Sequence, residues 1–249
     1  MTGLVNSTGA RSGVIGTTVG TPIQALGFIS ATFLTNSSTS SDSTGNYTKP
    51  AGCTKILVIA TGGGGAGAGA GSGQTGGGGG AGSTTIGYIT NSSSSYFNGI
   101  TAGSGTIAYS IGKGGAGVAG SAGTDGSDTW FGTDSVNFLL KGVGGGGGLT
   151  NGGASTFVNG SVGASAYATA DYMLLAGAQG TSEMGDGGSA LKTGGKGGAS
   201  YWGDGGPGAV ENSNTANNAQ TWGTGGGGAS GANGSGAGMG GAIVIYAYG

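Results

Sequence analysis

The sequence contains no histidine and a single cysteine, Cys53. Histidine is the commonest general base at neutral pH and the commonest metal ligand, so its absence argues against an enzyme. One cysteine excludes an intrachain disulfide and a zinc site built from paired cysteines. We therefore expect a non-enzymatic protein with no catalytic residues, no metal site and no cofactor.

Charge is also scarce, with seven Lys or Arg and nine Asp or Glu among 249 residues. Nucleic-acid binding needs clustered basic side chains that neutralise phosphates, so we expect no nucleic-acid partner. No stretch has the apolar length of a membrane span, and residues 1–18 lack the continuous apolar segment of a secretory signal. Membrane insertion and export by such a signal are both disfavoured.

Glycine is present in great excess, at 69 residues, whereas average usage is about 7%. In a helix or strand each glycine costs roughly 0.5 to 1 kcal/mol relative to alanine, so this excess indicates either disorder or an order that only glycine permits. Disordered chains combine low hydrophobicity with high net charge. This chain is 35% hydrophobic with a net charge of −2, which favours ordered glycine.

The glycines gather in tracts between apolar segments. Polyglycine can form a threefold extended helix, like one strand of collagen, whose N–H and C=O groups all point outward. Several such helices side by side can pair these groups with one another. The alternative is silk-like β structure, which the Gly/Ala alternation at 65–71 also suits, but the pure runs at 76–80 and 144–148 leave a sheet no side chains to pack. The tracts are residues 62–73, 76–82, 112–123, 142–148, 194–200 and 223–241.

The segments between the tracts are short, β-branched or aromatic, and bounded by turn residues, which is typical of strands. No segment has convincing helical periodicity. We predict an all-β protein with a sandwich-like core and a lattice of polyglycine type II helices. Residues 1–24 are expected to form an extended attachment arm, and residues 25–249 the glycine-rich β domain. The predicted strands are residues 27–34, 55–61, 83–90, 105–112, 136–142 and 242–249, with weaker candidates near Ser155 and at 164–175.

Four motifs follow one another in a recognisable order: KPAGCTKILVIATGGGGAGAG from Lys49, GGGGGAGSTTIGYI from Gly76, GGKGGASYWGDGGPG from Gly194, and the terminal GGAIVIYAYG. Over residues 27–249 this order resembles the glycine-rich domain of bacteriophage tail-fibre and adhesin proteins. The resemblance implies a virion protein that binds a host-surface glycan or outer-membrane protein. It also implies contact with other virion proteins through the arm and a homo-oligomer, with a trimer favoured. The alternative is a purely structural virion protein (a capsid or tail decoration) or extracellular-assembly protein that acts by self-association.

A glycine surface offers only backbone groups, so recognition is expected in the connecting segments 91–100, 124–135, 150–163 and 210–222. At least two of them should gather at one end, away from the arm. Flat rings beside polar residues are suited to recognition, whereas Trp202 is expected to close an end of the lattice. The candidate receptor-binding residues are Tyr96, Phe97, Trp130, Phe131 and Trp222.

Other motifs in the sequence give only weak indications of a metal, nucleotide or catalytic site. The carboxylates of Asp125, Asp128 and Asp134 lie in a glycine-containing loop that could hold calcium, although a solvated turn is the favoured explanation. The pattern GxGxxG recurs by chance at this glycine content, and IGKGG lacks the Ser or Thr that a phosphate-binding loop requires. Acid pairs such as Glu183 with Asp186 do not establish the separation that glycoside cleavage needs.

Overall fold

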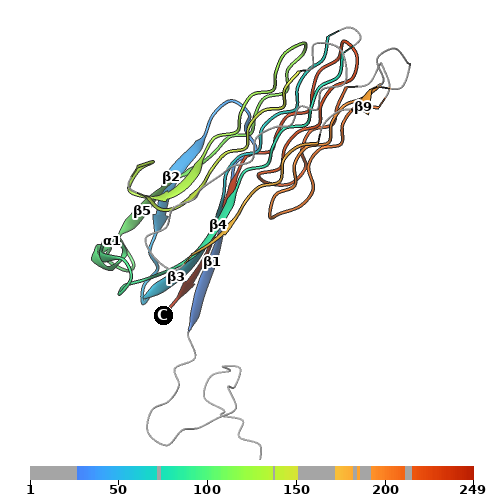
Figure 1. The fold of residues 1–249 in the computed structure, drawn as a ribbon. Helices are drawn as coiled ribbons and strands as arrows, with labels where there is room; N and C mark the ends of the chain where they lie inside the picture. Colours follow the sequence, from blue (N-terminus) through green and yellow to red (C-terminus); the bar gives the residue numbers. More distant parts are fainter. Residues whose placement is uncertain are drawn as a thin grey trace, which may run out of the picture.

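The computed structural model describes residues 27–71, 74–136, 138–150, 172–181, 184–185, 192–210 and 215–249. The described chain is elongated, with strands at one end and glycine tracts running lengthwise toward the other (Figure 1). β1 begins and the chain ends at the strand end. The predicted arm at 1–24 and the weak strand near Ser155 lie outside the described residues.

In the described part of the chain, the larger sheet has five strands in the order β1-β11-β3-β4-β8, and each is antiparallel to its neighbours. The C-terminal strand β11 lies between β1 and β3, so residues from both ends of the described chain build one sheet. Val58 and Ile245, which are directly opposite each other, face the core and are fully buried. The strands are β1 (Phe28–Thr35), β3 (Lys55–Thr61), β4 (Thr84–Thr90), β8 (Tyr172–Leu175) and β11 (Ala242–Tyr248).

The smaller sheet has four described strands, all antiparallel, in the order β2-β5-β6-β7. Its inner face carries Ile107, Phe131 and Leu140, which pack in one core with the inner face of the larger sheet. The predicted all-β sandwich is therefore confirmed. The strands are β2 (Ser43–Thr48), β5 (Thr106–Ile111), β6 (Thr129–Gly132) and β7 (Phe138–Gly142).

Three short elements complete the described structure. One helical turn, α1 (Ser95–Gly99), follows β4, and β9 (Met184–Gly185) pairs with β10 (Lys192–Thr193). Among the described residues, no helix has the length and apolar character that crossing a membrane requires.

The glycine tracts form a lattice of extended chains, and tract 62–70 shows its geometry most fully. Each N–H of this tract donates to a neighbouring tract, and the same neighbour recurs at every third residue. This period, with outward-pointing backbone groups, is that of polyglycine II, so the predicted lattice is confirmed. The donors Gly62, Gly65 and Ala68 reach Ser83, Gly80 and Gly77; Gly63, Ala66 and Gly69 reach Ser127, Thr124 and Ser121; Gly64, Gly67 and Ala70 reach Met239, Gly236 and Asn233.

The carbonyl groups of tract 62–70 reach further tracts. Gly145 and Gly148 donate to Gly63 and Ala66, Gly226 and Ala229 donate to Gly65 and Ala68, and Gly115 donates to Gly64. In the described part of the chain, tract 62–70 is thus surrounded by six others, and all of its residues are buried. Because its backbone groups find partners on every side, the backbone bonding offsets the entropic cost of ordering glycine.

Glycine is required in the lattice because the tracts approach one another backbone to backbone. A Cβ atom added at Gly67 would collide with the carbonyl group of Gly227, and one added at Gly65 would collide with that of Gly146. The neighbouring atoms are main chain, so they cannot move aside as a flexible side chain would. Direct contact between backbones is therefore what excludes side chains from these positions.

Side chains supply the missing acceptors where a tract has no neighbour on one side. Asp125 Oδ1 accepts from the Gly147 N–H at 2.7 Å, and Asp128 Oδ1 accepts from the Gly144 N–H at 2.9 Å. These two pairs repeat at the lattice spacing of three residues. The edge of the lattice is thus completed by polar residues rather than left unsatisfied.

Candidate functional site

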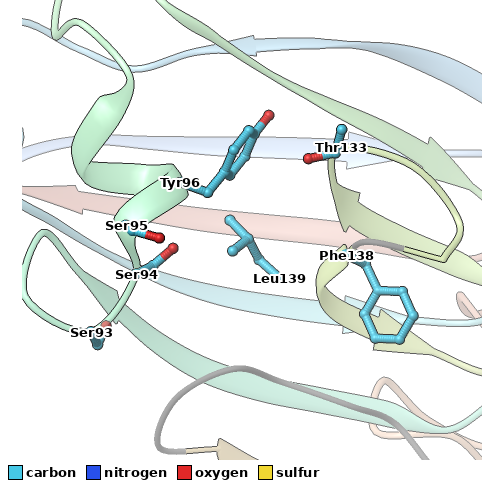
Figure 2. A pocket seen from close by; sticks show the side chains of 7 residues that line it. All are labelled: Ser93, Ser94, Ser95, Tyr96, Thr133, Phe138 and Leu139. Atoms are coloured by element: carbon cyan, nitrogen blue, oxygen red, sulfur yellow. The ribbon is translucent and has the colours of Figure 1, made fainter.

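A pocket of about 310 Å³ lies between α1 and the hairpin that joins β6 to β7. Its volume is at the lower end of the range of about 300 to 1,000 Å³ that ligand pockets have. Figure 2 shows Leu139 between the helix residues on one side and the hairpin residues on the other. The lining residues are Ser93, Ser94, Ser95, Tyr96, Thr133, Phe138 and Leu139.

Local sequence explains why a helical turn forms beside the pocket. The Ser94 hydroxyl accepts from the Phe97 N–H at 3.1 Å, which caps the first turn of α1. The ring of Phe97 is fully buried in the core and holds the turn against the sandwich. Tyr96, its neighbour, is 37% exposed at the pocket. Because Phe97 points into the core, the ring of the adjacent Tyr96 lies at the surface.

Lys49 lies beneath this turn and is only 2% exposed. Its Nζ donates to the Phe97 carbonyl at 2.9 Å, to the Ile100 carbonyl at 3.2 Å and to Asn91 Oδ1 at 3.1 Å. The ammonium group also lies 4.0 Å from the centre of the Phe97 ring. Burial lowers the pKa of Lys49, and the negative charge that the nearby Cys53 side chain carries when ionised opposes this shift. Lys49 therefore ties together both ends of the segment that carries Tyr96.

The pocket combines flat rings with hydroxyl groups. Tyr96 and Phe138 contribute the rings, and the nearly buried Leu139 contributes an apolar surface between them. Within the described part of the chain, the hydroxyls of Ser95, Tyr96 and Thr133 make no hydrogen bond, whereas those of Ser93 and Ser94 are engaged with local backbone. Unengaged hydroxyls beside a ring can bind a polar molecule that also has an apolar face.

The five candidate receptor-binding residues do not form one site. Tyr96 lines the pocket, while Trp130 is half-buried on β6, between Ser110 and Lys141 in the register of the sheet. Phe97 and Phe131 are fully buried core residues. Their predicted contact with a receptor is corrected on this ground, because a ring enclosed by the sandwich cannot touch a partner. Sequence position beside polar residues does not reveal which of two adjacent rings faces inward.

Trp222 belongs to a cluster of aromatic rings where the sandwich meets the lattice. Its ring is 5.0 Å from that of Phe33 and 6.3 Å from that of Trp202, both edge to face. Tyr201 packs edge to face on Trp202 at 4.9 Å. Phe33 is 50% and Tyr201 48% exposed, so this aromatic cluster reaches the surface.

The three carboxylates considered for calcium are used separately. Asp125 and Asp128 accept from lattice N–H groups, and Asp128 also pairs with Lys141 at 2.6 Å. Asp134 accepts from the Val136 N–H within its own turn. No group of three acids, cysteines or histidines that could hold a metal is found among the described residues. Each of these aspartates thus accepts a hydrogen bond from a backbone N–H group.

Two of the four predicted recognition segments meet at the pocket, since 91–100 contributes Tyr96 and 124–135 contributes Thr133. They meet on the sandwich, the half where β1 begins, and not at the far end of the lattice (Figure 1). Most of 150–163 and residues 211–214 lie outside the described residues. The sequence did not indicate Lys49, because its burial depends on contacts with a segment more than 40 residues away.

Two packed antiparallel sheets continued by a lattice of polyglycine II helices define a glycine-rich, all-β class of protein. The family model of the glycine-rich domain matches residues 38–248, so the chain belongs to that family. A search of curated proteins gave no significant match.

Proposed function

We propose that this chain is an adhesin module of a bacteriophage tail fibre, located in the virion, that binds a glycan on the host cell surface. The observation that carries the proposal is the pocket beside α1, where two separate segments bring together rings and unengaged hydroxyls. The order of the glycine-rich motifs, which resembles phage tail-fibre domains, supplies the context.

The chemistry of the pocket supports a saccharide ligand in particular. A sugar ring has an apolar face, which can stack on Tyr96 or Phe138, and hydroxyl groups at its rim, which can bond to Ser95 and Thr133. The pocket has room for a small saccharide unit. Its lining side chains carry no charge, which fits a neutral ligand better than a charged one.

The rigid lattice supports a role in holding the binding module away from its point of attachment. Backbone bonding in three dimensions holds the tracts without a large apolar core, so the module can extend from its point of attachment. In this proposal residues 1–24 attach the module to other virion proteins, as the sequence resemblance implies.

The proposal is tested with purified full-length protein, an array of bacterial surface glycans and intact cells of candidate host strains. Tyr96→Ala should weaken binding by a factor of about 30 or more, the usual effect of removing a central aromatic anchor. Tyr201→Ala is the matched control, since it removes another exposed tyrosine, which lies in the aromatic cluster away from the pocket. Equal binding by wild-type protein and Tyr96→Ala would exclude the pocket, and failure of the wild-type protein to bind any glycan or cell would exclude adhesion.

The second candidate function is structural, through self-association. One specific observation favours it as well: β1 is a long, uncharged strand at the edge of the larger sheet, with no strand beyond it among the described residues.

A further inference from the structure

One side of β1 has backbone groups with no partner in the described structure. Among the described strands, β1 lies at the edge of its sheet and pairs with β11 alone. In an antiparallel pair, alternate residues turn both backbone groups toward the neighbour. The Asn36 N–H donates to the Gly241 carbonyl at 3.2 Å, so Asn36 is one of the residues that face β11. Every second residue before it in the register, Leu34 and Thr32, also turns its backbone groups toward β11. The N–H and C=O groups of Ala31, Phe33 and Thr35 therefore point away from β11.

The edge of β1 lacks the usual protection against further pairing. Natural edge strands are blunted by charged side chains, proline or short length, whereas β1 has the sequence FISATFLT over eight residues. The opposite edge of the same sheet, β8, has only four residues. The edge strand β2 is polar and is flanked by Asp42 and Lys49. Among the edges of the two sheets, β1 alone is both long and apolar.

Exposed apolar side chains continue from this edge. Phe28 is 61%, Ile29 37% and Phe33 50% exposed. The two phenylalanines together leave about 200 Å² of ring surface in solvent, taking roughly 200 Å² for each whole side chain. A stable interface needs about 800 Å² from each partner, and Ile29, the strand edge and the exposed Tyr201 of the aromatic cluster extend this surface toward that area.

We propose that β1 binds β1 of a second copy of this chain, antiparallel across a two-fold axis perpendicular to the sheet. The two larger sheets then form one continuous antiparallel sheet. The occupant is a second copy because β1 has no charge that would select a different partner. In a two-fold antiparallel pair, the free N–H and C=O groups of Ala31, Phe33 and Thr35 face the same groups of the other copy. The two strands can therefore bond to each other. This inference goes beyond host binding and does not rest on it.

The test is the mass of the full-length chain in solution, measured by sedimentation over a range of concentrations. The wild-type protein should form a closed dimer. Ala31→Lys should weaken the dimer by roughly tenfold or more, because it places a lysine from each copy near the two-fold axis and charges the edge. Thr44→Lys is the matched control, since it adds the same charge at an exposed position of the edge strand β2, and it should leave the dimer unchanged.

A cysteine variant tests the position of the contact directly. Cys53 is only 2% exposed, so an added cysteine is the reactive one. Ala31→Cys should crosslink two chains with a short bifunctional maleimide, whereas Thr44→Cys should not. A monomeric or trimeric wild-type protein, a dimer unaffected by Ala31→Lys, or equal crosslinking of the two cysteine variants would overturn the proposal.

Discussion

Trp202 donates its indole N–H to the hydroxyl of Thr61 at 2.8 Å, across 141 positions of sequence. Thr61 is the last residue of β3, and its hydroxyl also lies 2.8 Å from that of Thr84, the first residue of β4. The bond thus lies where two strands become glycine tracts. The indole covers this end of the lattice and joins it to the sandwich, as the packing role expected for Trp202 requires.

Trp202→Phe should lower the free energy of unfolding by about 1 kcal/mol or more, because it removes the donor to a buried hydroxyl while keeping a ring on Phe33 and Trp222. Tyr201→Phe, which alters an exposed ring of the same cluster, should be close to neutral. Urea unfolding followed by fluorescence measures both variants. A neutral Trp202→Phe would show that the junction does not depend on this bond.

Gly67→Ala should destabilise the protein by about 1 to 3 kcal/mol or more, because the added methyl group meets the backbone of Gly227 with no room to relax. Gly234→Ala makes the same chemical change where the nearest atom is 3.8 Å away. It should have little effect on stability. Thermal and urea unfolding compare the two, and equal stabilities would contradict close packing of the tracts.

Lys49→Met should destabilise the segment that carries Tyr96. The carbonyls of Phe97 and Ile100 lose their side-chain donor, at a cost of about 1 to 3 kcal/mol for a buried group left without a partner. Hydrogen exchange of residues 91–100 should rise, and any glycan binding should fall with it. Lys196→Met is the control, because its ion pair with Asp204 is solvent-exposed. Unchanged exchange in Lys49→Met would contradict the positioning role.

Tyr47 should make stability depend on pH in the alkaline range. Burial raises the pKa of its hydroxyl to about 12, an effect that the nearby Ser30 hydroxyl opposes only in part. Since the folded state holds this proton more tightly than the unfolded state, the contribution to stability is present below pH 10 and is lost as the pH rises toward 12.

Tyr47→Phe should abolish this part of the pH dependence. Because the Tyr47 hydroxyl is buried with no hydrogen-bond partner in the described structure, the substitution should be neutral or slightly stabilising at pH 7. Unfolding free energies measured from pH 9 to pH 12 compare the two proteins. Parallel curves for wild type and variant would contradict the assigned pKa.

Much of the architecture could be predicted from the sequence, because strands and glycine tracts are each indicated by a short run of neighbouring residues. The strand predicted at 55–61 is β3 as observed, and the one predicted at 242–249 differs from β11 by one residue. The pure glycine runs correctly indicated a lattice. By contrast, β2 was not among the predicted strands, because STGNYT has only one apolar residue, Tyr47, to show which face is buried.

The pocket could be predicted only in part. Polar segments containing aromatic residues indicated 91–100 and 124–135, but their meeting depends on how the two sheets pack. Phe138 and Leu139 belong to a predicted strand whose side chains gave no reason to place them in a site. Lys49 became important only through contacts with the turn above it, which no local pattern encodes.

The lengthwise course of the tracts has a mechanical consequence. When the far end of the lattice is pulled away from the sandwich, the force acts along the tracts and therefore across the hydrogen bonds that join them. Bonds loaded in this shearing direction must break many at a time, whereas bonds pulled open from one end break in succession. The six neighbours of tract 62–70 share such a load from every side, so the lattice can transmit tension along its length with no large hydrophobic core of its own.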